Sequence, residues 1–240
     1  MENPSTKLKE RIKLFSFSSP EETASALADH IGDLLGAALA QHGETSMAVS
    51  GGSTPKPLFR ALAKKSLAWQ HIHITLVDER WVNPDHPDSN EKLVRDHLLR
   101  DEASAAHFVG LKNSHPTAAL GRAVTEQNVA AMPHPFEVVI LGMGSDGHTA
   151  SFFPGAPELA RALDIRSPFL CESVTPPKAP LDRITITLPV LLQAHHRILH
   201  ITGQEKLEVL AKALELQNAE HMPIYALFRF SPAPVVYWCS

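Results

Sequence analysis

Short apolar segments with the pattern of buried strands alternate with segments of helical spacing along the whole 240-residue sequence. This alternation is typical of a mostly parallel β-sheet with helices packed on both faces. The clearest helix is expected to begin near Pro20 and to stop at Gly43. No repeat or low-complexity stretch interrupts the pattern, and the length suits one large domain. We therefore predict a single α/β domain over residues 1–240, with a doubly wound, Rossmann-like sheet.

The predicted strands are the short apolar runs between polar or helical segments. They cover residues 12–17, 46–49, 72–77, 136–141, 169–174, 184–188, 198–201 and 235–238. Further helices are expected from the loop at residue 50 to about residue 65, from the polar loop 78–88 to about residue 100, and over 116–131 and 204–216. Ligands in such sheets bind beyond the carboxyl ends of the strands, so the loops after the strands are the places to search for function.

The charge and cysteine content exclude several classes of protein. The 22 basic and 26 acidic residues give a net charge of -4 and form no basic tract that could follow a nucleic-acid backbone. No apolar run has membrane-spanning length, and the first ten residues are polar rather than signal-like. Cys171 and Cys239 are too few for a disulfide framework. We expect a cytoplasmic protein with no nucleic-acid or membrane partner.

The first unusual loop, residues 50–55, reads SGGSTP and lies between a predicted strand and a predicted helix. Glycines let a backbone approach an anion closely, and a helix N-terminus offers free N–H groups. A phosphate is the expected ligand, and an ordinary tight turn between strand and helix is the alternative. The loop matches neither the Walker pattern nor G-x-G-x-x-G, so nucleotide binding is not indicated.

The second loop begins with Asp78-Glu79-Arg80 at the end of an apolar strand. Arg80 could clamp a phosphate through two parallel hydrogen bonds. Alternatively, Asp78 and Glu79 only neutralise Arg80. A little further on, Asp88 or Ser89 opens a predicted helix, and for this pair we favour a capping role.

The third loop, residues 141–151, reads LGMGSDGHTAS and leaves the apolar strand 136–141. Three glycines in six residues predict a tight backbone that holds Asp146 and His148 near one point. A histidine can take a proton from water near neutral pH, a neighbouring carboxylate can orient it, and loop N–H groups can hold a developing oxyanion. We therefore predict a catalytic role for this loop.

Other polar residues carry weaker signals. Arg183 precedes a predicted strand and Lys206 lies at the start of a predicted helix, so both could bring positive charge to the same edge of the sheet. Considered alone, Lys206 has the character of a solvated surface lysine. His71 and His73 would share a strand face, and residues 195–196 are both histidine, but no complete metal-ligand spacing accompanies either pair. No metal site is predicted.

Taken together, these loops resemble those of the 6-phosphogluconolactonase family. The matching segments cover nearly the whole chain in the expected order and are GGSTP at 51–55, DERWV at 78–82, DSN at 88–90, LGMG at 141–144, DGHTAS at 146–151, FPG at 153–155 and RIT at 183–185. The histidine loop with its FPG continuation is highly specific, whereas GGSTP is shared with related sugar-phosphate enzymes. The departures are small: Phe152 replaces a usual leucine, and the C-terminal residues 239–240 lack a frequent acidic residue.

The resemblance implies a modified doubly wound fold, shared with glucosamine-6-phosphate deaminases and ribose-5-phosphate isomerases. It also implies hydrolysis of 6-phospho-D-glucono-1,5-lactone to 6-phosphogluconate in the oxidative pentose phosphate pathway, without metal or other cofactor. His148 is then the expected base, with Asp146 to orient it. The residues expected to hold the substrate or its phosphate are Gly51, Gly52, Ser53, Thr54, Asp78, Arg80, Gly144, Arg183 and Lys206. The only expected partner is the sugar-phosphate lactone, and the chain is expected to be a monomer or a weak homodimer.

Two other functions stay open at this point. In an aminosugar-6-phosphate isomerase or deaminase, Asp78 would abstract a proton from carbon, but Arg80-Trp81 and the sequence at 149–151 resemble the lactonase versions of these loops. A sugar-phosphate-binding regulator on the same fold would have lost catalysis. The intact Asp146 and His148 argue against that function, as does the absence of a recognisable DNA-binding module.

Overall fold

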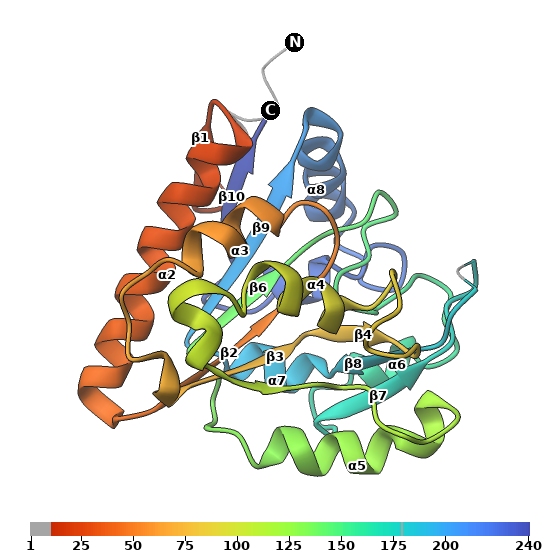
Figure 1. The fold of residues 1–240 in the computed structure, drawn as a ribbon. Coiled ribbons are helices and arrows are strands. Elements are labelled where there is room, and N and C mark those ends of the chain that lie inside the picture. Colours follow the sequence, from red (N-terminus) through yellow and green to blue (C-terminus); the bar gives the residue numbers. More distant parts are fainter. Residues whose placement is uncertain (1–10, 179) are drawn as a thin grey trace.

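The protein is described here by a computed structural model that covers residues 11–178 and 180–240. The prediction about the polar first ten residues therefore lies outside the described residues. A seven-stranded sheet runs through the centre of the molecule in the order β1-β10-β9-β6-β2-β3-β5, and all neighbouring strands in it are parallel (Figure 1). Its strands are β1 (Leu14–Phe17), β2 (Thr45–Val49), β3 (Ile72–Leu76), β5 (His107–Val109), β6 (Val138–Leu141), β9 (His196–Thr202) and β10 (Val235–Cys239).

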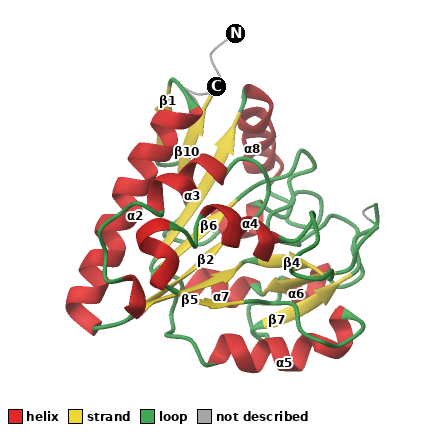
Figure 2. Cartoon of the chain, viewed as in Figure 1, coloured by secondary structure: helices red, strands yellow, loops and turns green. Residues whose placement is uncertain are grey.

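Helices cover both faces of this sheet (Figure 2). They are α2 (Pro20–His42), α3 (Lys56–Leu62), α4 (Asn90–His97), α5 (Ala118–Ala130), α6 (Leu159–Ala162), α7 (Leu188–Gln193), α8 (Gln204–Leu216) and α9 (Tyr225–Phe228), with 3₁₀ turns at Trp69–His71 and Asp101–Ala105. Helices α2 and α3 pack together on one face, whereas α7, α8 and α9 lie together on the other. The central strands β2 and β6 are buried along their whole length, as expected for strands covered on both faces. The predicted α/β fold with a mostly parallel sheet is confirmed.

Local sequence signals explain why the longest helix forms where it was predicted. The side chain of Ser19 accepts a hydrogen bond from the Glu22 N–H, and Pro20 occupies the first turn. Gly43 ends α2 in the left-handed region, with φ of 80°. Helix α8 also has its predicted bounds. Helix α3, however, ends at Leu62 rather than near residue 65, and α4 ends at His97.

A second, smaller sheet corrects the sequence analysis. Its antiparallel strands lie in the order β4-β8-β7 and are β4 (Asp78–Arg80), β8 (Arg183–Ile186) and β7 (Cys171–Val174). We predicted a loop at 78–88, but its first three residues form β4, with Arg80 opposite Arg183. A charged three-residue strand has no apolar alternation, so only its distant partner reveals it.

Some short elements were missed for related reasons. Strand β5 has three residues, and α6, α7 and α9 have four to six, which is too short for a helical period to be read from the sequence. Leu188, predicted as the end of a strand, instead begins α7, where Pro189 occupies the first turn. Both cysteines are buried and free. None of the helices within residues 11–178 and 180–240 is long and apolar enough to cross a membrane.

Candidate active site

The order of the central strands reverses between β2 and β6, where the two glycine-rich loops leave the sheet. From β2 the chain continues to β3 and β5 on one side, and it then returns to β6 on the other side of β2. The loops after these two strands therefore diverge and leave a crevice. Ser50 ties their bases together, because its N–H donates to the Ile140 carbonyl at 3.0 Å and its Oγ accepts from the Gly142 N–H at 3.1 Å.

A cleft of about 300 Å³ opens at this crevice. Its walls combine the loops after β2 and β6 with the start of β4, the end of β9 and the first turn of α8. The predicted site residues that line it are Gly51, Gly52, Ser53, Thr54, Asp78, Arg80, Gly144, His148 and Lys206. The fold thus brings residues that are far apart in the sequence into one cavity. Asp146 and Arg183 do not line the cleft, but each contacts or adjoins a residue that does.

His148 and Asp146 form a hydrogen-bonded pair at the wall of the cleft. The imidazole Nδ1 lies 2.5 Å from Asp146 Oδ1, which also accepts the His148 backbone N–H at 3.1 Å. The hydrogen bond with the imidazole is the main reason why the pKa of Asp146 is lowered to about 2. A carboxylate at Nδ1 assigns the proton of a neutral imidazole to that nitrogen and leaves Nε2 free to accept a proton. The Phe153 ring packs against the imidazole, with centroids 4.5 Å apart.

Two glycines make this pair possible. A Cβ on Gly144 would lie 2.2 Å from the His148 ring and 2.7 Å from the Asp146 carboxylate, so no other residue fits without moving them. Gly147 has φ of 78°, a conformation that L side chains rarely adopt. Its carbonyl accepts the Ile224 N–H at 2.8 Å, which anchors the loop to the segment before α9. The glycine spacing seen in the sequence is thus a steric requirement of the His148–Asp146 contact.

Several N–H groups of the histidine loop are engaged within the protein. The Gly144 N–H donates to the His148 carbonyl at 2.9 Å, and the Gly147 N–H donates to the Gly144 carbonyl at 3.1 Å. The Gly142 N–H is bound by Ser50 Oγ. These bonds hold the loop in one conformation. They also occupy three of the N–H groups that we expected to be available for an oxyanion, those of Gly142, Gly144 and Gly147. The oxyanion role stays a prediction for the remaining N–H groups of the loop.

Asp78, at the start of β4, is hydrogen-bonded to the histidine loop. Its carboxylate is buried and accepts the Ser151 hydroxyl at 2.6 Å. The Ser151 N–H in turn donates to Thr185 Oγ1 at 3.3 Å, and Thr185 lies opposite Asp78 in the small sheet. The small sheet therefore fixes the histidine loop relative to the wall of the cleft.

Glu79 has a structural role that the sequence did not reveal. Its fully buried carboxylate accepts the N–H groups of Arg80, Asn90 and Glu91 and the hydroxyl of Ser89, at 2.7 to 2.9 Å. It therefore binds the N-terminus of α4, although burial raises its pKa. The favoured capping role is confirmed for Ser89, whose Oγ accepts the Lys92 N–H at 3.2 Å.

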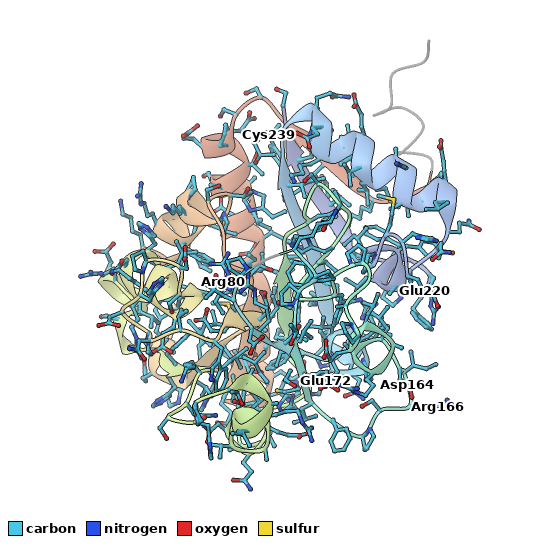
Figure 3. The ribbon with its side chains drawn as sticks, turned by 90° about the vertical axis from the view of Figure 1, so that its right-hand side faces the viewer. Arg80, Asp164, Arg166, Glu172, Glu220 and Cys239 are labelled. Atoms are coloured by element: carbon cyan, nitrogen blue, oxygen red, sulfur yellow. The ribbon has the colours of Figure 1, made fainter. Side chains whose placement is uncertain are left out.

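Arg80 is free to bind an anion. Its guanidinium, labelled in Figure 3, lines the cleft and donates to the Asp88 backbone carbonyl. Within the described residues it forms no ion pair with Asp78 or Glu79, so the alternative that these carboxylates neutralise it is wrong. Arg183 is the partner of Arg80 on the neighbouring strand β8, buried and outside the cleft, with its guanidinium 5.9 Å from the centre of the Phe153 ring. Burial and then the charge of Arg80 lower the pKa of Arg183.

The location of Lys206 in the cleft could not be predicted from its local sequence. By itself it has the character of a surface residue, and only the family resemblance suggested a ligand role. In the structure it is half-buried in the first turn of α8 and lines the cleft. The sharp junction between β9 and α8 is made by Gly203, with φ of 93°. Lys206 forms no ion pair among residues 11–178 and 180–240.

Asn90 and His200 are among the cleft residues that the predicted site does not include. Asn90 donates from Nδ2 to the Asp78 carbonyl at 2.8 Å, and a Cβ on Gly51 would lie 1.8 Å from its Oδ1. The DSN motif contains Asn90 and was the available signal. His200 lies near the end of β9, between Leu199 and Ile201 and outside every motif. It is the one polar residue in the predicted strand 198–201, and that was the only clue to it.

The histidine pairs named from the sequence lie elsewhere. His73 stacks on His107 with ring centroids 5.0 Å apart, and its Nε2 lies 3.7 Å from a carboxylate oxygen of Glu44. His196 Nε2 lies 3.4 Å from Glu137. In the part of the chain that the structure describes, no three His, Cys, Asp or Glu side chains gather as they would around a metal ion.

Comparison with known proteins assigns the family. A family model described as glucosamine-6-phosphate isomerases/6-phosphogluconolactonase matches residues 18–237. The chain belongs to this family. The resemblance stated from the loop motifs is therefore confirmed.

Relatives and structures from this family are similar over almost their whole length. The chain is 44% identical to a 6-phosphogluconolactonase of Rhizobium meliloti, covering 92% of this chain and 96% of the relative. It is 40% identical to that of Pseudomonas aeruginosa, covering 97% of each chain. The crystal structure of a 6-phosphogluconolactonase from Shewanella baltica superposes with a TM-score of 0.93 at 42% identity, covering 95% of this chain and 98% of that one.

Proposed function

We propose that this chain hydrolyses 6-phospho-D-glucono-1,5-lactone to 6-phosphogluconate, the reaction of the oxidative pentose phosphate pathway for which its relatives are named. The observation that carries the proposal is His148, joined to Asp146 at 2.5 Å, in the same cleft as Arg80 and Lys206. A base that can activate water thus faces a cavity equipped to bind a phosphate. Both requirements of a phosphorylated lactone are met in one place.

Substrate binding in this proposal depends on cations and on the SGGSTP loop. Arg80 and Lys206 contribute positive charge to the cleft, and residues 51–54 bring backbone and hydroxyl donors to its wall. Phosphate oxygens accept hydrogen bonds from all of these groups. Arg183 adds positive charge from the strand beside Arg80 rather than a direct contact, because it does not line the cleft. With the phosphate held, the C1 carbonyl of the lactone is placed near His148.

The chemical step then uses His148 as base and acid in turn. Nε2 removes a proton from water as the water oxygen bonds to C1. The π electrons of the carbonyl move onto its oxygen, which becomes the oxyanion. When the carbonyl reforms, the bond from C1 to the ring oxygen breaks, and the imidazolium gives its proton to that oxygen. Asp146, anionic because its pKa is about 2, stabilises the imidazolium through Nδ1. The cytoplasmic location and the monomeric or weakly dimeric state stay predictions from the sequence.

The test is lactone hydrolysis by wild type and His148→Ala, followed in a pH-stat with freshly generated substrate against the uncatalysed background. Removing the base should lower kcat by about 10²- to 10⁴-fold. His195→Ala is the matched control, because His195 is exposed and lies outside the cleft. No acceleration by wild type would contradict the proposal, and ammonia release from glucosamine 6-phosphate would then favour the deaminase. An equally active His148→Ala would remove His148 as the base.

A further inference from the structure

His200 is a polar side chain buried in the wall of the cleft without an internal partner. It is 4% exposed and lies on β9, where its neighbours Leu199 and Ile201 are apolar. Its Nδ1 is fully buried and has no hydrogen-bond partner within the described residues. No hydrogen bond to Nε2 occurs there either, but Nε2 is not fully buried, so it is the nitrogen that faces the cleft. Burial lowers the pKa of His200 to about 4, so the ring is neutral at neutral pH.

The strand register places this imidazole on the face of the sheet that α2 and α3 cover. His200 is the parallel partner of Tyr237 on β10, and such partners point to the same face. The Tyr237 ring packs against those of Phe17, with centroids 5.8 Å apart, and His30 of α2, at 6.1 Å. Helix α3 begins directly after the loop 50–55 and packs on α2. His200 therefore lies on the same side of the sheet as the helix that this loop opens.

The neighbouring strand leaves the ring edge accessible. Leu141 on β6 is the partner of Leu199, so the next position beside His200 is Gly142, which has no side chain. Two residues further along, β9 ends at Thr202, and Lys206 follows in the first turn of α8. His200 thus lines the same cleft as the SGGSTP loop and Lys206, the two features that equip the cleft for an anion.

We propose that His200 is a substrate-binding residue that donates a hydrogen bond from Nε2–H to the phosphate of the bound sugar. This inference rests on the proposed function for the identity of the ligand. A buried N–H without a partner is rarer and more costly than an unpartnered acceptor, so the proton of the neutral ring belongs on Nε2 rather than on the buried Nδ1. The Nε2–H then gains a hydrogen bond when an anion in the cleft accepts it. A neutral donor also suits a cleft that already contains Arg80 and Lys206, because it adds no further like charge. The residue would therefore favour phosphorylated lactones over unphosphorylated ones.

The experiment compares His200→Phe, which keeps a planar ring but removes the donor, with His200→Gln, which restores an N–H of similar reach. Dissociation constants of 6-phosphogluconate and of inorganic phosphate are measured by calorimetry, and kcat and KM are measured with the lactone. Phe should weaken 6-phosphogluconate binding and raise KM about 10- to 100-fold with little change in kcat, since a hydrogen bond to a charged group is lost. Gln should recover most of that loss, and hydrolysis of unphosphorylated glucono-1,5-lactone should be equal in all three proteins.

Binding by a folded His200→Phe within twofold of wild type would overturn the inference, as would an equal loss with the unphosphorylated lactone. If His200→Phe does not fold, the test uses the wild-type protein. Addition of 6-phosphogluconate should then shift the Nε2 resonance of His200 in a ¹H–¹⁵N spectrum. An unchanged resonance would contradict the proposal. Calorimetry separates this test from that of the proposed function, because phosphate binding is measured whether or not the lactone is hydrolysed.

Discussion

At the scale of single residues, the site depends on one short contact between an exposed carboxylate and a half-buried imidazole. Asp146 lies on the solvent side of His148, with its side chain 54% exposed, and its oxygen contacts both the ring and the backbone of that residue. The contact defines which ring nitrogen is free for chemistry. Asp146 thus orients the imidazole of His148 without itself lining the cleft.

Asp146→Asn should therefore lower kcat by about 10²- to 10⁴-fold and leave KM nearly unchanged, because the amide removes the charge that stabilises the imidazolium. Steady-state kinetics with the phosphorylated lactone measure both constants. A large rise in KM with an unchanged kcat would instead assign Asp146 to substrate binding.

The same substitution predicts a pH effect on stability. The pKa of Asp146 in the folded protein is lowered from 3.8 to about 2, so the carboxylate stabilises the fold fully above about pH 4 and loses this effect as the pH falls toward 2. Wild type should therefore lose stability relative to Asp146→Asn over that range. The effect is small, because the side chain is half-exposed and solvent screens it. Urea unfolding of both proteins at several pH values measures the difference, and parallel curves would contradict it.

At the scale of elements, the glycines of the histidine loop differ in how closely other atoms surround them. A Cβ on Gly144 would overlap the His148 ring, whereas a Cβ on Gly142 would have its nearest neighbour, Ser50 Cβ, at 4.0 Å. The loop is thus sterically closed at one glycine and open at another. Helix α4, which also borders the site, is likewise held by close contacts, because the Glu79 carboxylate accepts the N–H groups at its N-terminus.

We expect Gly144→Ala to lower kcat at least about tenfold, because the added methyl group displaces the imidazole by more than catalysis tolerates. Gly36→Ala, in α2 and outside the cleft, is the control and should stay within a few-fold of wild type, because its added Cβ would meet Leu67 at an ordinary 3.7 Å. Circular dichroism shows whether both variants fold. Equal activities of the two alanine variants would show that the Gly144 contact does not position His148.

At the scale of the whole molecule, the charge of the cleft opposes the charge of the protein. The chain has a net charge of -4, yet Arg80 and Lys206 line the cleft and Arg183 lies beside Arg80 on the neighbouring strand. These residues come from three separate parts of the chain: β4 and β8, which pair in the small sheet, and the start of α8 directly after β9. An anionic substrate is attracted to this side of an otherwise acidic protein.

Lys206→Ala should accordingly raise KM roughly tenfold, with a smaller change in kcat, since it removes one cation that binds phosphate. Lys212→Ala, on the exposed side of the same helix, is the control and should behave as wild type. Added salt should raise the KM of wild type more than that of Lys206→Ala, because screening acts on a charge that the variant lacks. The same salt dependence in both proteins would place Lys206 outside the phosphate site.

The sequence alone determined the α/β class, most long helices and the central strands, because hydrophobic period and helix caps are local properties. It also identified the SGGSTP loop and the His148 loop, since glycine and catalytic residue types stand close together there. Only the tertiary structure decided that Asp78–Arg80 form a strand, that Glu79 caps α4 instead of neutralising Arg80, and that Lys206 and His200 line the cleft. These facts depend on contacts between residues distant in the chain, and a lysine or histidine has the same local sequence whether it faces solvent or a ligand.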